Sequence, residues 1–190
     1  GRSWEFVQHA AIAPHDSVGS NIFIHTLRGQ VKRVVPRENE QVNETWISDR
    51  DRFGYEGIHS DDRLAKPLVG GVETGWEPAL EAAASGLKDI ITRHGAESVG
   101  FLVAPTATVE EMYLAQKLAR GLGVVNIDHR LRQADFSDQG AAPVFPWLGQ
   151  ALEDLEKVKA ALLIGSNPRM EQPLAGHRLR KAALAGGQIL

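Results

Sequence analysis

The stretch IAPHDSVGSNI, residues 12–22, has the residue types of a loop that wraps an inorganic centre. Its proline, its glycine and its small polar residues allow tight turns around a bound metal. The chain contains no cysteine, so it offers no thiolate, the ligand that iron–sulfur clusters require. The loop therefore has the form of a metal site from which the ligands are missing.

A second candidate site is the sequence IGSNPRME, residues 164–171, which predicts a strand end, a glycine turn and a helix start. The backbone N–H groups of Gly165, Ser166 and Asn167 could bind an anion such as a nucleotide phosphate. The simpler interpretation is an ordinary helix start, with Ser166 or Asn167 as N-cap and Pro168 in the first turn. We favour the helix start.

The sequence lacks the other catalytic and metal-binding motifs that we considered. The seven histidines are scattered, and none has the H-x3-H or H-E-x-x-H spacing of a zinc site. His15 is therefore predicted to be a hydrogen-bonding loop residue. There is no G-x-S-x-G of a hydrolase and no G-x-G-x-x-G of a nicotinamide site. The basic segment at 177–187 is predicted to be a solvated helix face.

The composition bounds the class of protein. A chain of 190 residues with 43% hydrophobic content can bury a core. A net charge of −3 gives no basic field, so nucleic acid is not a predicted partner. No run of about 18 apolar residues is present, so direct membrane insertion is not predicted either.

The elements expected from the pattern fall into two parts, with a boundary in the Gly-rich stretch 69–75. Residues 1–70 are predicted to form a small β-rich lobe, with a hairpin of 21–27 and 30–36 turning at Arg28-Gly29. Residues 71–190 alternate helix and strand, which predicts an open, mostly parallel, three-layer α/β/α sheet. The fold class is thus α/β, with a Rossmann-like second domain.

Helix starts and strands in the second part can be predicted individually. Thr74 with Glu77, and Thr108 with Glu111, have capping-box spacing. The remaining expectations are helices near 147–157 and 171–185 and strands at 98–105, 123–127, 160–165 and from 188. Because the chain starts at Gly1 and stops at the beginning of this last strand, we expect a piece cut from a longer polypeptide, with the α/β domain incomplete.

The N-terminal part resembles the iron–sulfur lobe of the molybdopterin oxidoreductase fold. That family holds a [4Fe–4S] cluster with the pattern C-x2-C-x3-C-x27-C. The resemblance places the four ligand positions, with intact spacing, on Ala13, Asp16, Ser20 and Ser48. It therefore implies a vacant cluster site.

The stretches RENEQVNETW, residues 37–46, and DRDRFGY, residues 49–55, are similar to the large iron–sulfur subunits of respiratory complex I, the NADH-quinone oxidoreductase. Some members of that family keep the four cysteines and others have lost them. The resemblance also implies that Arg50 stands for a lysine and Asp51 for a glycine.

The molybdenum site of formate-dehydrogenase-type relatives can be placed on NIDHRLRQAD, residues 126–135. Its scaffold residues correspond to Asn126, Asp128 and Arg132. The metal ligand corresponds to Ala134 and the adjacent histidine to Asp135. The resemblance thus implies that the molybdenum-ligand position is vacant as well.

The function implied is that of a scaffold segment in the peripheral arm of complex I, cytoplasmic and peripheral to the inner membrane. The segment itself is expected to be inactive and to carry no cofactor, with iron–sulfur clusters in a preceding N-terminal region. Ile12, Trp46, Phe53 and Tyr55 are predicted to fill the former cluster volume. The alternatives are a pterin- or nucleotide-binding domain that uses residues 165–168, and an active molybdenum or tungsten enzyme with unusual ligands.

Overall fold

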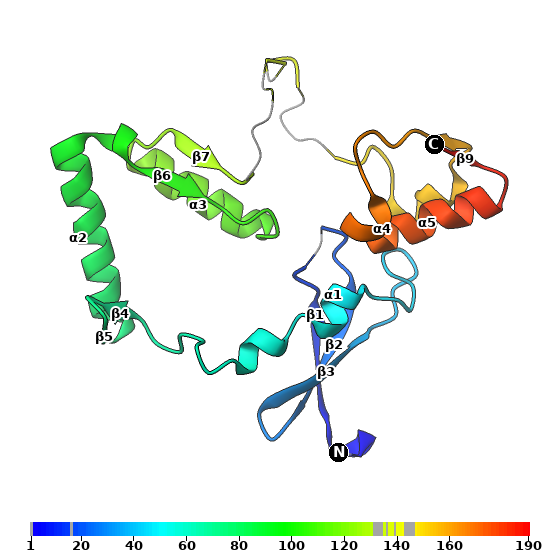
Figure 1. The fold of residues 1–190 in the computed structure, drawn as a ribbon, viewed down its shortest axis with the longest axis horizontal. Coiled ribbons are helices and arrows are strands. Elements are labelled where there is room, and N and C mark those ends of the chain that lie inside the picture. Colours follow the sequence, from blue (N-terminus) through cyan, green and yellow to red (C-terminus); the bar gives the residue numbers. More distant parts are fainter. Residues whose placement is uncertain (1, 16, 131–134, 136, 139, 143–146) are drawn as a thin grey trace. The chain divides into compact units, whose positions relative to one another are not determined.

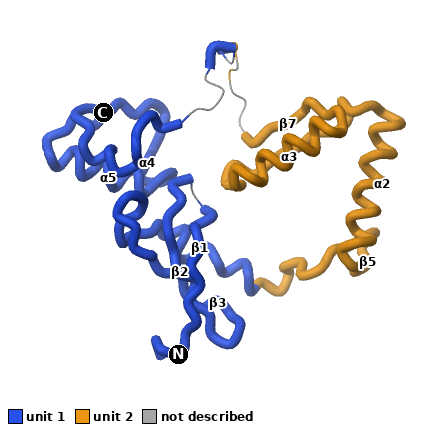
Figure 2. The backbone as a smooth tube through the Cα atoms, turned by 180° about the vertical axis from the view of Figure 1, so that it is seen from behind, with its two compact units in different colours: residues 1–59, 138–190 blue, residues 60–137 orange. Residues whose placement is uncertain are grey.

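The computed structural model describes residues 2–15, 17–130, 135, 137–138, 140–142 and 147–190. They form two compact units (Figure 2), unit 1 with residues 1–59 and 138–190 and unit 2 with residues 60–137. No helix within the described ranges is long and apolar enough to cross a membrane. The α/β character predicted from the sequence is confirmed.

Unit 1 begins with a three-stranded antiparallel sheet in the order β1-β2-β3 (Figure 1). Its elements, with those that follow up to residue 59, are η1 Ser3–Glu5, β1 Val7–Ile12, β2 Asn21–Leu27, β3 Gln30–Pro36, α1 Asp49–Phe53 and η2 Glu56–His59. The β2–β3 hairpin is confirmed, because Arg28 and Gly29 adopt the positive φ angles, 51° and 77°, that a tight two-residue turn requires. One face of the sheet packs the buried residues Ile22 and Val34 against Ile47.

The rest of unit 1 comprises η4 Leu152–Lys157, β8 Ala160–Ala161, α4 Pro168–Glu171, α5 Pro173–Leu184 and β9 Gln188–Ile189. β8 and β9 pair in parallel, as the predicted strand–helix alternation requires. The predicted helix near 147–157 is a short 3-10 helix. The predicted helix at 171–185 corresponds to α5, which begins at Pro173, because Glu171 is the last residue of α4.

Unit 2 contains β4 Leu68–Val69, β5 Val72–Glu73, α2 Trp76–His94, η3 Ala96–Ser98, β6 Gly100–Leu102, α3 Val109–Gly121 and β7 Asn126–Asp128. β6 and β7, which precede and follow α3 in the chain, pair in parallel. The Thr108–Glu111 capping box is confirmed at the start of α3. The Thr74–Glu77 box is wrong, because Gly75 is the N-cap of α2 and no side chain caps that helix.

A network of charges joins the loop at 37–46 to α5 within unit 1. Arg178, 2% exposed, donates to the backbone oxygens of Glu40 and Val42 at 2.7 and 3.0 Å and to Glu156 at 2.6 Å. Lys181 lies 2.7 Å from Glu156. The prediction of a solvated basic face at 177–187 is therefore wrong for Arg178, because the carbonyl groups of a distant loop replace water around its guanidinium group.

This network makes the stability of unit 1 depend on pH. The hydrogen bond from Lys181 holds the pKa of Glu156 below its ordinary value of 4.5. A carboxylate with a lowered pKa stabilises the folded state above its unfolded-state pKa, and this contribution is lost as the pH falls through the folded-state value. We therefore expect the free energy of unfolding to fall below about pH 4.5, and to fall less steeply in Glu156→Gln.

Urea unfolding at a series of pH values measures this slope. The matched control is Glu153→Gln, which changes a carboxylate of the same 3-10 helix and should keep the wild-type slope. A slope in Glu156→Gln as steep as that of the wild type would assign the acid sensitivity to other groups.

Candidate functional site

The positions predicted to correspond to cluster ligands lie around one small core, as far as the structure describes them. Ala13 is buried in the same cluster as Ile47, the residue directly before Ser48. The Ala13 amide donates to the Ser20 carbonyl oxygen at 2.8 Å. Ala13, Ser20 and Ser48 are 4%, 0% and 3% exposed. Asp16 lies outside the described residues.

A buried carboxylate organises this region. Asp51 is fully buried and uses both oxygens, since Oδ2 accepts from Ser48 Oγ at 2.7 Å and Oδ1 lies 3.1 Å from His15 Nδ1. Its backbone N–H donates to Ser48 Oγ at 3.1 Å, which makes Ser48 the N-cap of α1. His15 is thus a hydrogen-bonding loop residue, as predicted.

An aromatic ring and a glycine surround the histidine. The rings of His15 and Tyr55 meet edge to face with their centroids 5.4 Å apart. Burial, together with the nearby Asp51 carboxylate, raises the pKa of the Tyr55 hydroxyl. A Cβ on Gly54 would lie 2.7 Å from His15 Nε2. The imidazole can therefore occupy this position only because glycine has no side chain.

The predicted filling of this volume by Ile12, Trp46, Phe53 and Tyr55 is correct only for Tyr55, which packs against the core. Ile12, Trp46 and Phe53 are 55%, 56% and 64% exposed. The pairing of His15 with Asp51 was not predicted from the sequence. One signal was present, because Ser48 and Asp51 have the S-x-x-D spacing of a helix start.

The donor set does not match a [4Fe–4S] cluster. Ala13 presents a methyl group, which cannot ligate iron, and the Ser48 hydroxyl is bonded to Asp51. Ser20 Oγ is buried and has no hydrogen-bond partner among the described residues. A cluster needs thiolates, and the chain has no cysteine to supply them.

The residues aligned with a molybdenum site are only partly described, since Arg132 and Ala134 lie outside the described residues. Asn126 fastens β7 to the preceding segment by donating to the carbonyl oxygens of Glu97 and Val99. The Asp135 carboxylate accepts from the Ser137 amide at 2.9 Å. These contacts give Asn126 and Asp135 local structural roles.

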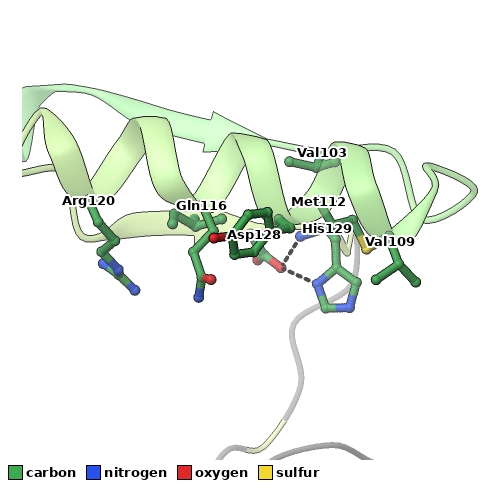
Figure 3. A pocket seen from close by; sticks show the side chains of 9 residues that line it. Val103, Val109, Met112, Gln116, Arg120, Asp128 and His129 are labelled. Atoms are coloured by element: carbon green, nitrogen blue, oxygen red, sulfur yellow. Dashed lines mark hydrogen bonds and ion pairs between the residues drawn. The ribbon is translucent and has the colours of Figure 1, made fainter.

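A pocket of about 440 Å³ lies along α3, from Val109 to Arg120, beside β7 (Figure 3). Apolar side chains such as Val103 and Met112 line it together with Asp128 and His129. The Asp128 carboxylate accepts from the amides of His129 and Arg130 at 2.7 and 3.0 Å, and these bonds, that of Arg130 first, lower its pKa. Its Oδ1 therefore stabilises the turn that follows β7.

The turn at 165–167 already binds an anion from its own chain. Ser166 Oγ and the Asn167 amide donate to Glu171 Oε2 at 2.8 and 3.2 Å. Pro168 begins α4, with Asn167 at the N-cap, as the helix-start interpretation predicts. The Glu171 carboxylate therefore occupies the Asn167 amide, one of the three backbone donors predicted for a phosphate, together with the Ser166 hydroxyl.

Within the described ranges, no group of three or more histidine, aspartate or glutamate side chains is placed to hold a metal ion. His59 Nε2 lies 3.2 Å from the Val31 carbonyl oxygen, which gives it a structural partner. Asp51 and Ser48 are both buried and hydrogen-bonded to each other, and they lie at positions that the sequence resemblance had singled out.

Comparison with known proteins assigns each part of the chain to a family. The model of the 4Fe-4S domain described as NADH-ubiquinone oxidoreductase NDSU1/NuoG-like matches residues 8–56. The model described as Molybdopterin oxidoreductase matches residues 63–189. The resemblance inferred from the motifs at 13–55 is thereby confirmed.

Individual relatives agree with this assignment. An NADH-quinone oxidoreductase subunit of Rickettsia bellii is 33% identical over 189 residues, which cover 97% of this chain and 27% of the relative. The subunit of the same name from Rickettsia conorii is 32% identical, with coverages of 94% and 26%. The alpha subunit of the NADPH-Fe(3+) oxidoreductase of Geobacter sulfurreducens is 33% identical, with coverages of 96% and 22%.

The chain thus spans about a quarter of the length of these relatives. The family model that covers residues 63–189 accounts for more than half of it. By this match and by the cluster-lobe match before it, the chain belongs to the molybdopterin oxidoreductase family.

Proposed function

We propose that this chain is a scaffold segment of a large subunit in an NADH-quinone oxidoreductase, and that it carries neither an iron–sulfur cluster nor molybdenum. The observation that carries the proposal is the state of the inherited ligand positions. Two of them, Ala13 and Ser48, offer a methyl group and a hydroxyl bonded to Asp51, in a chain without cysteine. The segment would then contribute architecture and no redox centre.

The relatives support the wider role. The two Rickettsia proteins are named as subunits of NADH-quinone oxidoreductase, and this chain aligns with about a quarter of each. In the whole complex, electrons from NADH would pass to quinone through clusters in a region that precedes this one. The segment's partners would be other peripheral-arm subunits, at the cytoplasmic side and peripheral to the inner membrane.

The domain arrangement proposed from the sequence is a degenerate iron–sulfur lobe, residues 1–70, and a Rossmann-like domain, residues 71–190. The two family matches, which end at residue 56 and begin at residue 63, support a two-part organisation. β6 with β7 and β8 with β9 form two separate two-stranded sheets, and their parallel pairing supports the parallel strand direction of the proposed three-layer sheet.

Iron and acid-labile sulfide analysis tests the proposal. The purified chain is incubated anaerobically with ferrous iron and sulfide and then desalted, with a cysteine-ligated ferredoxin treated in parallel. We expect background iron and sulfide in the chain and a full cluster in the ferredoxin, because only the latter supplies thiolates. Stoichiometric iron and sulfide in the chain, or stoichiometric molybdenum as purified, would contradict the proposal.

A further inference from the structure

The two segments that carry the inherited ligand positions are far apart in the sequence. Ala13 and Ser20 flank a loop after β1, whereas Ser48 begins α1. A cluster bound to residues of both segments would be the covalent link between them. A lobe without the cluster therefore needs another contact that fastens the loop to α1.

We propose that the His15–Asp51–Ser48 cluster of side chains is this contact, and that Asp51 is the positioning residue that replaces the iron–sulfur cluster as the crosslink of the lobe. The inference rests on the proposed function, since it concerns a lobe without iron. Asp51 reaches His15 across 36 positions of the sequence and holds Ser48 at the start of its own helix.

The burial of the carboxylate supports this role. Asp51 is fully buried, whereas the His15 side chain is 30% exposed, so water has little access to the carboxylate side of the shared hydrogen bond. Hydrogen bonds to a charged group contribute more than neutral ones, and a buried carboxylate is costly when a partner is lost. Ser48 satisfies the second oxygen, which leaves neither carboxylate oxygen of Asp51 without a partner.

The neighbouring residues fit the same role. Gly54 leaves room for the imidazole, and the Tyr55 ring meets its edge. The Ala13–Ser20 backbone bond closes the loop between these two residues. The amide of Ala13 is therefore a local reporter of whether the loop stays closed.

Hydrogen exchange in the full chain tests the crosslink. In His15→Gln and in Asp51→Asn we expect the Ala13 amide to exchange about tenfold faster, whereas amides of β2 keep their rates, because the loop opens locally. The double variant should exchange no faster than Asp51→Asn alone. The matched control is Asp49→Asn, an exposed carboxylate on the same helix, which should leave the Ala13 rate unchanged.

Asp51 is fully buried, so its replacement could unfold the lobe. In that case the exchange rate of the Ala13 amide in His15→Gln decides the test, because His15 is partly exposed. An unchanged Ala13 rate in His15→Gln, or effects of the two substitutions that multiply in the double variant, would overturn the crosslink. Neither result concerns iron. Stoichiometric iron and sulfide in the wild-type chain would instead overturn the proposed function, so the two failures are distinguishable.

Discussion

Replacing Arg178 with methionine should lower the free energy of unfolding of unit 1 by about 2–4 kcal/mol. The guanidinium group is buried between two backbone carbonyl oxygens and Glu156. Methionine keeps much of the side-chain volume but leaves Glu156 and both carbonyl groups without this donor. Glu156 keeps its ion pair with Lys181, so the cost comes from the lost hydrogen bonds of a charged donor and from carbonyl groups left without it.

Urea unfolding of the chain, followed by tryptophan fluorescence, measures the loss. Trp46 is a suitable reporter, since its ring lies 6.1 Å from that of His177. Arg180→Met is the matched control, because Arg180 is exposed on the same helix, and its effect should stay within about 0.5 kcal/mol. Equal losses of unfolding free energy in the two variants would show that the buried contacts of Arg178 do not stabilise unit 1 more than an exposed arginine does.

Replacing Gly54 with alanine should cost about 1–3 kcal/mol of unfolding free energy. A Cβ at this position would lie 2.5 Å from the Arg50 carbonyl oxygen and 2.7 Å from His15 Nε2. The backbone oxygen belongs to α1 and cannot move without distorting the helix. The imidazole would therefore be displaced, together with its contact to Asp51.

Gly57→Ala is the control for this substitution, because a Cβ on Gly57 would meet no atom within 4 Å. We expect its unfolding free energy to stay within about 0.5 kcal/mol of the wild type. Thermal or urea unfolding compares the two variants directly. A Gly54→Ala chain as stable as Gly57→Ala would mean that the histidine loop adapts without cost.

Local patterns in the sequence predicted the features that local hydrogen bonds decide. The β2–β3 hairpin follows from the Arg28-Gly29 turn, and α3 starts at the Thr108–Glu111 capping box. The lack of thiolate ligands could likewise be predicted from the sequence, because it depends only on the absence of cysteine. The α2 helix is a partial exception, because its N-cap lies one residue beyond Thr74, at Gly75.

The resemblance to a cluster-binding lobe also came from the sequence, because it depends on spacing, and the family matches confirm it. What occupies the lobe could not be predicted in the same way. Large aromatic residues were the expected filling by hydrophobicity, yet Trp46 and Phe53 are exposed while a carboxylate is buried. Hydrophobicity alone does not identify a polar group whose partners lie elsewhere in the chain.

The sequence by itself determined the family, the hairpin, the start of α3 and the lack of sulfur ligands, since each depends on residues close together or on residue type. Only the tertiary structure decided that Arg178 and Asp51 are buried. Arg178 bonds to residues that lie 22 and 138 positions away in the sequence. Asp51 contacts His15, which lies 36 positions away. A charged group can be buried only where folding brings such partners to it. The hydrophobic periodicity of one helix does not predict partners that come from other parts of the chain.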